Sequence, residues 1–138
     1  MRLLTGAAAL TVLLACGCSG SRGDRPEAYP VAGRLLIDGE PAAGARVQLS
    51  AVGNERLAAL SPHAVAEADG SFRLTTYRTG DGAPAGRYAL TVTWPGRPQR
   101  GHEEGPDRLH GRYANPLRPA RTVEIAAAKN DLGTIQLP

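Results

Sequence analysis

Polar and apolar residues alternate along most of this chain, which is the two-residue period of β-strands that bury one face. The clearest pair of alternating runs flanks Asp69-Gly70, a dipeptide that accepts the positive φ angles of a two-residue hairpin turn. Short runs of this kind, separated by Gly, Pro, Asp and Asn, predict seven strands: 29–37, 45–52, 63–68, 71–77, 87–94, 121–126 and 132–137.

The alternation also predicts which side chains point inward. The inward positions include Val31, Leu35, Ile37, Ala45, Val47, Leu49, Val123 and Ile125. Trp94 is in phase with Tyr88, Leu90 and Val92, which favours a place in the core over a place on a ligand-binding surface. The facing of segment 63–68 stays open, because its apolar residues are mostly alanines.

Two stretches between the predicted strands do not alternate. Residues 53–62 fit either one or two helical turns or a loop, with Ser61-Pro62 as the stop. The long segment 95–119 is rich in proline, and a helical turn beginning at Asp107 would place Leu109 and Tyr113 on the sheets. We expect this segment to cover one sheet edge.

The fold class follows from the number of strands and from what joins them. No helix-length crossover separates neighbouring strands, so parallel pairing is not expected. The 17 glycines and 11 prolines favour many short strands over long helices, and aromatics at 4% require an aliphatic core. The sequence predicts an all-β, seven-stranded antiparallel β-sandwich over residues 29–138.

Charge excludes one class of partner. The net charge is +3, but the arginines are scattered and do not form the basic face of a nucleic-acid-binding protein. We therefore expect no nucleic-acid partner.

Near its start the chain has one charged residue, Arg2, which is followed by an apolar run of about 13 residues. Such a run is too short to span a bilayer but suits a signal peptide. Leu13-Leu14-Ala15-Cys16 resembles the lipobox of bacterial lipoproteins, which implies a signal peptide over 1–15 and a lipid on Cys16. Cys18 is the alternative acceptor, and an ordinary secretory signal or an uncleaved anchor is the alternative leader. Segment 16–28 has few apolar residues and is predicted to be a flexible tether.

The lipoprotein resemblance also implies a location. A lipid on the cysteine anchors the protein to a membrane of the cell envelope. In that family an Asp after the cysteine retains the protein in the inner membrane, so Gly17 implies the outer membrane. Neither cysteine lies in the predicted domain, so we expect no disulfide and no thiolate metal site there.

Three stretches, VAGRLLIDGEPAAGARVQL, AEADGSFRLTT and GAPAGRYALTVTW, resemble the carboxypeptidase-regulatory-like, transthyretin-like domain. They are especially similar to small bacterial lipoproteins that carry one such domain behind a lipobox. The matching residues are Val31, Gly33, Asp38, Gly39, Pro41, Gly44, Ala45, Val47, Asp69, Gly70, Phe72, Pro84, Gly86 and Tyr88. The resemblance implies a fold and an anchor but no activity.

Candidate chemistry is sparse. The histidines and carboxylates between His102 and His110 fit no standard metal spacing, and the domain has neither a Gly-x-Ser-x-Gly serine nor a cysteine nucleophile. We expect no enzyme, no cofactor and no metal. The possible ligand surface consists of Trp94, His102, His110 and Tyr113.

These observations predict a non-catalytic, lipid-anchored module of the cell envelope, of structural or protein-interaction type. The alternative is a glycan- or metal-binding envelope module that uses segment 95–113. The partner is an envelope protein or glycan that the sequence does not name.

Overall fold

The computed structural model describes residues 25–138. The predicted signal peptide, both cysteines and most of the predicted tether lie outside the described residues. The described part is nearly all β, with ten strands and one short helix: β1 (Ala28–Tyr29), β2 (Val31–Ile37), β3 (Glu40–Pro41), β4 (Arg46–Ala51), α1 (Glu55–Ala58), β5 (His63–Val65), β6 (Ser71–Arg73), β7 (Ala83–Pro84), β8 (Gly86–Thr93), β9 (Arg121–Ile125) and β10 (Asn130–Leu137).

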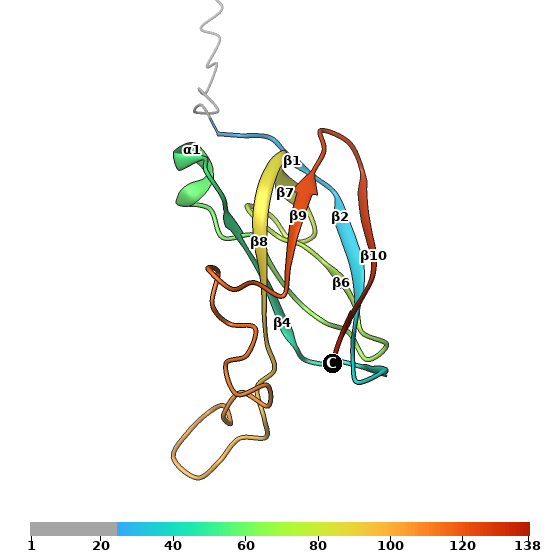
Figure 1. The fold of residues 1–138 in the computed structure, drawn as a ribbon, viewed down its shortest axis with the longest axis vertical. Coiled ribbons are helices and arrows are strands. Elements are labelled where there is room, and N and C mark those ends of the chain that lie inside the picture. The colour runs from blue at the N-terminus through green and yellow to red at the C-terminus, as the bar shows by residue number, and fades with distance from the viewer. Residues whose placement is uncertain (1–24) are drawn as a thin grey trace, which may run out of the picture.

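Two four-stranded sheets form the body of the molecule (Figure 1). One has the order β5-β4-β8-β9 and is antiparallel throughout. In the other, β10 lies along one edge of β2, while β3 and β6 pair with different parts of β2. A small third sheet joins β1 to β7, and a bridge between His63 and Thr75 connects the two large sheets.

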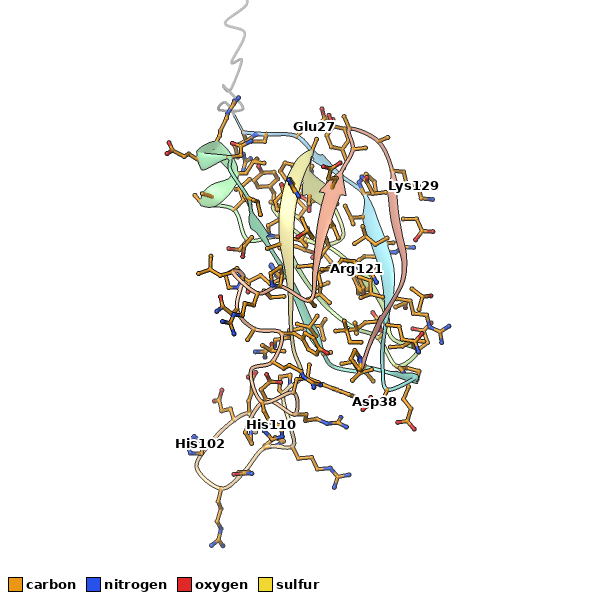
Figure 2. All side chains as sticks on the ribbon, viewed as in Figure 1. Glu27, Asp38, His102, His110, Arg121 and Lys129 are labelled. Carbon is orange, nitrogen blue, oxygen red and sulfur yellow. The ribbon has the colours of Figure 1, made fainter. Side chains whose placement is uncertain are left out.

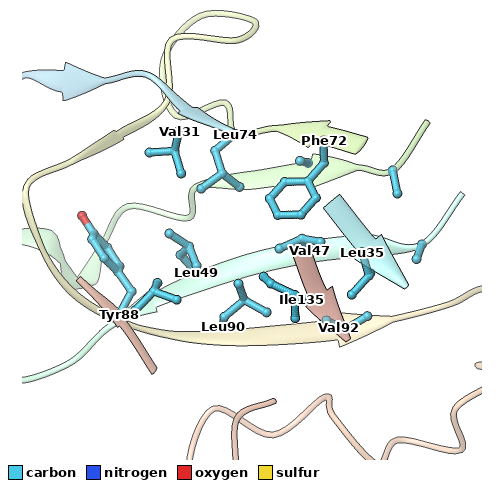
Figure 3. Close-up of a cluster of buried hydrophobic side chains, with 14 of the residues drawn as sticks. Val31, Leu35, Val47, Leu49, Phe72, Leu74, Tyr88, Leu90, Val92 and Ile135 are labelled. Carbon is cyan, nitrogen blue, oxygen red and sulfur yellow. The ribbon is translucent and has the colours of Figure 1, made fainter. Parts of the chain in front are cut away.

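A single aliphatic core lies between the sheets (Figure 3). Leu35 and Ile135 from one sheet and Leu49 and Leu90 from the other are fully buried. The predicted inward positions of strands β2, β4 and β9 are all buried, as are Ala45, Phe72 and Leu74. Tyr88 is the largest fully buried side chain, and its hydroxyl donates a hydrogen bond to the Pro84 carbonyl at 2.8 Å. Burial raises the pKa of Tyr88 to about 12.

One strand pair contradicts the predicted topology, because β10 runs parallel to β2. Parallel strands need a long connection between them, and here the entire domain supplies it. Connections between neighbouring strands give no sign of this pairing, because it joins the two ends of the domain. The sandwich is therefore mixed rather than antiparallel.

The predicted count of seven strands is also wrong for the described residues. Seven longer strands are present, but the two-residue strands β1, β3 and β7 raise the count to ten. Pro30 splits the predicted first strand, because proline has no N–H to donate, and β1 then joins β7 instead of the main sheet. The predicted strand 71–77 ends at Arg73, after which the chain turns around Asp81, whose carboxylate accepts the N–H groups of residues 76–78.

The two Asp-Gly dipeptides fold differently. Asp38 and Gly39 both have positive φ, at 53° and 79°, and make a two-residue turn between β2 and β3. At Asp69-Gly70 only the glycine has positive φ, at 84°, so the predicted two-residue turn is wrong there. Asp69 instead accepts hydrogen bonds from the Ser71 N–H and hydroxyl, and β5 and β6 diverge into different sheets.

Segment 53–62, left open by the sequence, contains the single turn of α1. The Asn54 side chain accepts the N–H of Arg56 at 3.1 Å and so caps the helix. Leu57 is buried against the core, which explains why this turn forms on the sandwich. In segment 63–68, also left open, Ala64 and Ala66 face inward.

Candidate functional site

Residues 95–113, here called the end loop, extend the molecule beyond the last residues of β8. Figure 1 shows the end loop at one end of the long axis and the start of the described chain at the other. In Figure 2, His102 and His110 lie at the end opposite to Glu27. The end loop is therefore the part of the domain farthest from the point where the chain enters it.

Asp107 organises the base of the end loop. Its carboxylate accepts hydrogen bonds from the backbone N–H groups of Trp94 at 2.9 Å, Leu109 at 3.0 Å and Gly111 at 2.9 Å. Burial raises the pKa of Asp107, but these three N–H groups outweigh it, so that the pKa lies below its ordinary value of 3.8. The Asp107 carboxylate thus accepts the three backbone N–H groups that have no carbonyl of a neighbouring strand to bond.

The end loop covers the edge of β8 beyond the point where β9 begins. The Val92 N–H donates to the Tyr113 carbonyl at 2.9 Å, and the Arg108 N–H donates to the Trp94 carbonyl at 2.7 Å. The Ala120 N–H donates to the Leu90 carbonyl at 2.9 Å, so pairing with β8 resumes before β9. The expectation of a cover over a sheet edge is confirmed.

Trp94 is half-buried against the core instead of lying inside it, so the predicted core position is wrong. The Arg108 guanidinium lies 3.5 Å from the centre of its ring, and its indole N–H donates to the Ala43 carbonyl at 2.9 Å. The alternation failed here because β8 ends at Thr93 and the chain turns away from the sheet. With one ring face covered and its polar group satisfied, Trp94 offers little surface for stacking on a ligand.

Leu109 and Tyr113 pack on the edge of the core, as predicted from the turn at Asp107. The Tyr113 hydroxyl donates to the Pro138 oxygen at 3.2 Å. Arg112 contributes a longer contact to the same oxygen at 3.4 Å. These contacts connect the end loop to the end of β10, so the base of the loop is held on both sheets.

His102 and His110 are exposed, and they lie on different parts of the end loop (Figure 2). No three His, Cys, Asp or Glu side chains of residues 25–138 are grouped so that they can hold a metal ion. Of the carboxylates near the histidines, Asp107 is committed to backbone N–H groups and Glu104 forms an ion pair with Arg46.

A groove that the sequence analysis missed lies between the β2–β3 turn and the base of the end loop. It has a volume of ≈ 600 Å³, and its lining includes Asp38 on one side and Arg108, His110 and Arg112 on the other. No periodicity brings residues 38 and 108–112 together, so only the folded structure reveals this groove. Its two arginines and its histidine suit an acidic group of a partner.

At the end of the molecule opposite to the end loop, side-chain contacts hold the first described residues on the sandwich. The Tyr77 hydroxyl donates to the Pro26 carbonyl at 2.8 Å, and the Arg25 guanidinium lies 4.8 Å from the Tyr77 ring centre. Pairing of β1 with β7 follows at once. Among residues 25–138, no helix has the length and apolar character needed to cross a membrane.

Comparisons with known proteins identify no family for this chain. No protein-family model matches the chain, and no curated protein sequence matches it. The chain is similar to a solved structure of a DUF3823 family protein from Parabacteroides merdae, with 16% identity and a TM-score of 0.46 over 80% of this chain and 46% of that one. It is also similar to part of a 9R-lipoxygenase from Cyanothece PCC8801, with 17% identity and a TM-score of 0.45 over 81% of this chain and 17% of that one. The chain thus spans less than half of either protein, and neither likeness assigns an activity.

Proposed function

We propose that this protein is a non-catalytic β-sandwich module that a lipid on Cys16 anchors to the cell envelope, and that its end loop binds a protein partner. The observation that carries the proposal is the placement of the end loop at the far end of the domain from the entry of the chain (Figure 1). An anchor before residue 25 would hold the entry end near the membrane and direct the end loop away from it.

The attachment of the entering chain supports this arrangement. Contacts of Arg25 and Pro26 with Tyr77 bring the chain onto the sandwich at one defined place. The base of the end loop is fixed by Asp107 and by contacts to Pro138, so the groove beside it is preformed. A preformed surface loses little conformational freedom when a partner binds.

The groove at the base of the end loop indicates the chemistry of the contact. Arg108, His110 and Arg112 line one wall, and Asp38 is the single carboxylate among the lining side chains. We propose that an acidic side chain of the partner binds against this wall, with the envelope as the setting and the outer membrane as the preferred membrane. We also propose that the sandwich is of the transthyretin-like type. The two-residue turn at Asp38 and Gly39 supports this, because both residues are part of the sequence pattern that resembles this domain.

The anchor is tested by fractionation of cells that express the full chain. Cys16→Ala should move the protein from the membrane to the soluble fraction, and globomycin should block its processing. Cys18→Ala is the matched control and should leave the protein at the membrane. Unchanged fractionation of Cys16→Ala would contradict the anchor, and loss of the membrane fraction with Cys18→Ala alone would move the lipid to Cys18.

Partner binding is tested by a photo-reactive amino acid at Gln99 in the exposed end loop, with Arg87 on the outside of β8 as the control position. We expect a discrete adduct from position 99 only, and we expect Arg112→Gln to weaken it. Equal adducts from both positions, or no effect of Arg112→Gln, would contradict binding through the end loop.

The alternative proposal is a glycan- or metal-binding module that uses the same end loop. A rise in the midpoint of thermal unfolding of the full chain with Ca²⁺, Zn²⁺ or a cell-wall sugar, lost in His102→Ala or Trp94→Ala, would favour it. The covered ring of Trp94 supports protein binding over glycan stacking.

A further inference from the structure

A second hollow lies on the outer face of the sheet that contains β2, away from the end loop. It has a volume of ≈ 520 Å³, within the range of small-molecule sites. The lining consists of Pro30, Val31, Ala32, Gly33, Arg34, Arg73, Gly80, Lys129, Asn130, Asp131, Gly133 and Thr134. Four segments of the chain therefore contribute to one site.

Small residues open this hollow. Ala32 and Gly33 come from the first half of β2, and the ring of Phe72 fills the space on the core side of Gly33. The pairing of β10 with β2 shifts register between Asp131 and Thr134, where Gly133 has a φ of 65°. Such a bulge bends its strand and interrupts regular pairing, which adds space beside β2.

Three cationic side chains line the hollow, from three separate elements. Arg73 stands on β6 opposite Ala32, Arg34 stands on β2, and Lys129 lies in the turn before β10. The only carboxylate in the lining is Asp131, which accepts the Gly133 N–H at 2.8 Å. The charge of the lining is therefore positive.

The backbone that carries these cations is fixed, while the Arg73 and Lys129 charges are not neutralised. The Asn130 side chain bonds the backbone of Ala126 and Ala128, which fixes the turn that carries Lys129. The Arg34 Nε donates to the Asp69 carbonyl at 2.8 Å, which leaves its terminal N–H groups for a ligand. Within residues 25–138, Arg73 and Lys129 have neither a hydrogen-bond nor an ion-pair partner for their side chains.

We propose that this hollow binds a compact organic anion, a molecule of about the size of a sugar that carries a carboxylate or a phosphate group. Arg73 and Lys129 bind the anionic group, Arg34 adds further donors, and the Ala32–Gly33 floor contacts the body of the molecule. Guanidinium and ammonium groups recognise both oxyanions, which is why the two ligand classes share one site. The site is separate from the end loop, so it does not depend on the function proposed above.

Isothermal titration calorimetry on the full-length protein tests this site with three probes that share one scaffold: glucose 1-phosphate, glucuronate and uncharged glucose. We expect saturable binding of at least one anion, no binding of glucose, and weaker binding as salt is raised. The anion that binds identifies phosphate or carboxylate as the ligand group. Binding of glucose as tight as that of the anions, or no binding of either anion, would overturn the proposal.

The double variant Arg73→Gln, Lys129→Gln removes the two unpaired charges and keeps a polar side chain at both positions. It should weaken anion binding at least about tenfold, the loss expected for a charge-assisted hydrogen bond. Its midpoint of thermal unfolding should not change, because neither side chain has a partner to lose. Lys129→Gln alone provides the same comparison if the double variant does not fold.

The matched control is Arg100→Gln, Arg118→Gln, which removes the same charge from exposed positions outside the hollow. It should bind the anion as the unchanged protein does. An equal loss in both double variants would show that net charge alone attracts the anion, and this would also overturn the proposal.

Discussion

The sandwich and the end loop of this protein are each stabilised by a different kind of interaction. In the sandwich, apolar side chains from facing strands exclude water, and Leu49 and Leu90 are fully buried. In the end loop few side chains are buried, and one carboxylate, Asp107, holds three backbone N–H groups. From this difference we expect the loop to lose its order more readily than the sandwich.

The largest effect is expected from a cavity in the sandwich. Leu90→Ala removes a fully buried side chain from the central strand β8 and should lower the free energy of unfolding by about 3 kcal/mol. Chemical denaturation followed by far-ultraviolet circular dichroism measures this loss. Leu117→Ala, at a side chain that is 89% exposed, is the control and should change almost nothing.

A somewhat smaller loss is expected at the turn before β6. Gly70 has a φ of 84°, and a Cβ there would lie 2.4 Å from the Leu35 carbonyl oxygen in β2. Gly70→Ala should therefore cost about 2 kcal/mol or more of unfolding free energy. Gly53 also has positive φ but open space around it, so Gly53→Ala should cost less; equal losses would mean that the contact with Leu35 does not matter.

Loss of the Asp107 carboxylate should affect the end loop alone. Asp107→Asn should weaken the hydrogen bonds to Leu109 and Gly111 by about 1 kcal/mol and speed the exchange of these amide hydrogens. The exchange of the amides that pair β4 with β8 inside the sheet should not change. Glu103→Gln, at an exposed residue of the same loop, is the control; faster exchange throughout the sandwich would contradict the separation of the two regions.

Acid should produce a milder form of the same change, because a protonated carboxyl still accepts weak hydrogen bonds. The pKa of Asp107 is lower in the folded loop than its ordinary value of 3.8. Its stabilising contribution is therefore complete above that ordinary value and is lost as the pH falls through the lowered pKa. Trp94 is the only tryptophan and lies at the base of the loop, so its fluorescence should change in this range while circular dichroism of the strands does not.

The sequence predicts the sandwich well where burial alone decides the structure. Alternation identified the inward side chains of β2, β4 and β9, since a strand that slips by one residue exposes all of them. It failed where pairing joins distant parts of the chain, as between β2 and β10. Nothing in either segment specifies a parallel partner at the other end of the domain.

The candidate sites were less predictable, because backbone and long-range contacts decide them. Trp94 continues the phase of β8, but its backbone N–H donates to the Asp107 carboxylate and its ring lies against the Arg108 guanidinium. From the sequence, Asp107 fits the start of a turn or a metal ligand, and its hydrogen bond across the loop to the backbone N–H of Trp94 has no local signature. The hollow lined by Arg73 and Lys129 likewise depends on four segments that only the fold brings together.

The orientation of the anchored domain tests the central claim of this account most directly. Lipidated protein in vesicles that contain a lipid-attached fluorescence quencher reports how near its tryptophan is to the membrane. We predict little quenching of Trp94 at the far end and stronger quenching in the variant Trp94→Phe, Tyr29→Trp, whose tryptophan lies at the entry end. Strong quenching of Trp94, equal to or greater than that in the variant, would contradict an end loop directed away from the membrane.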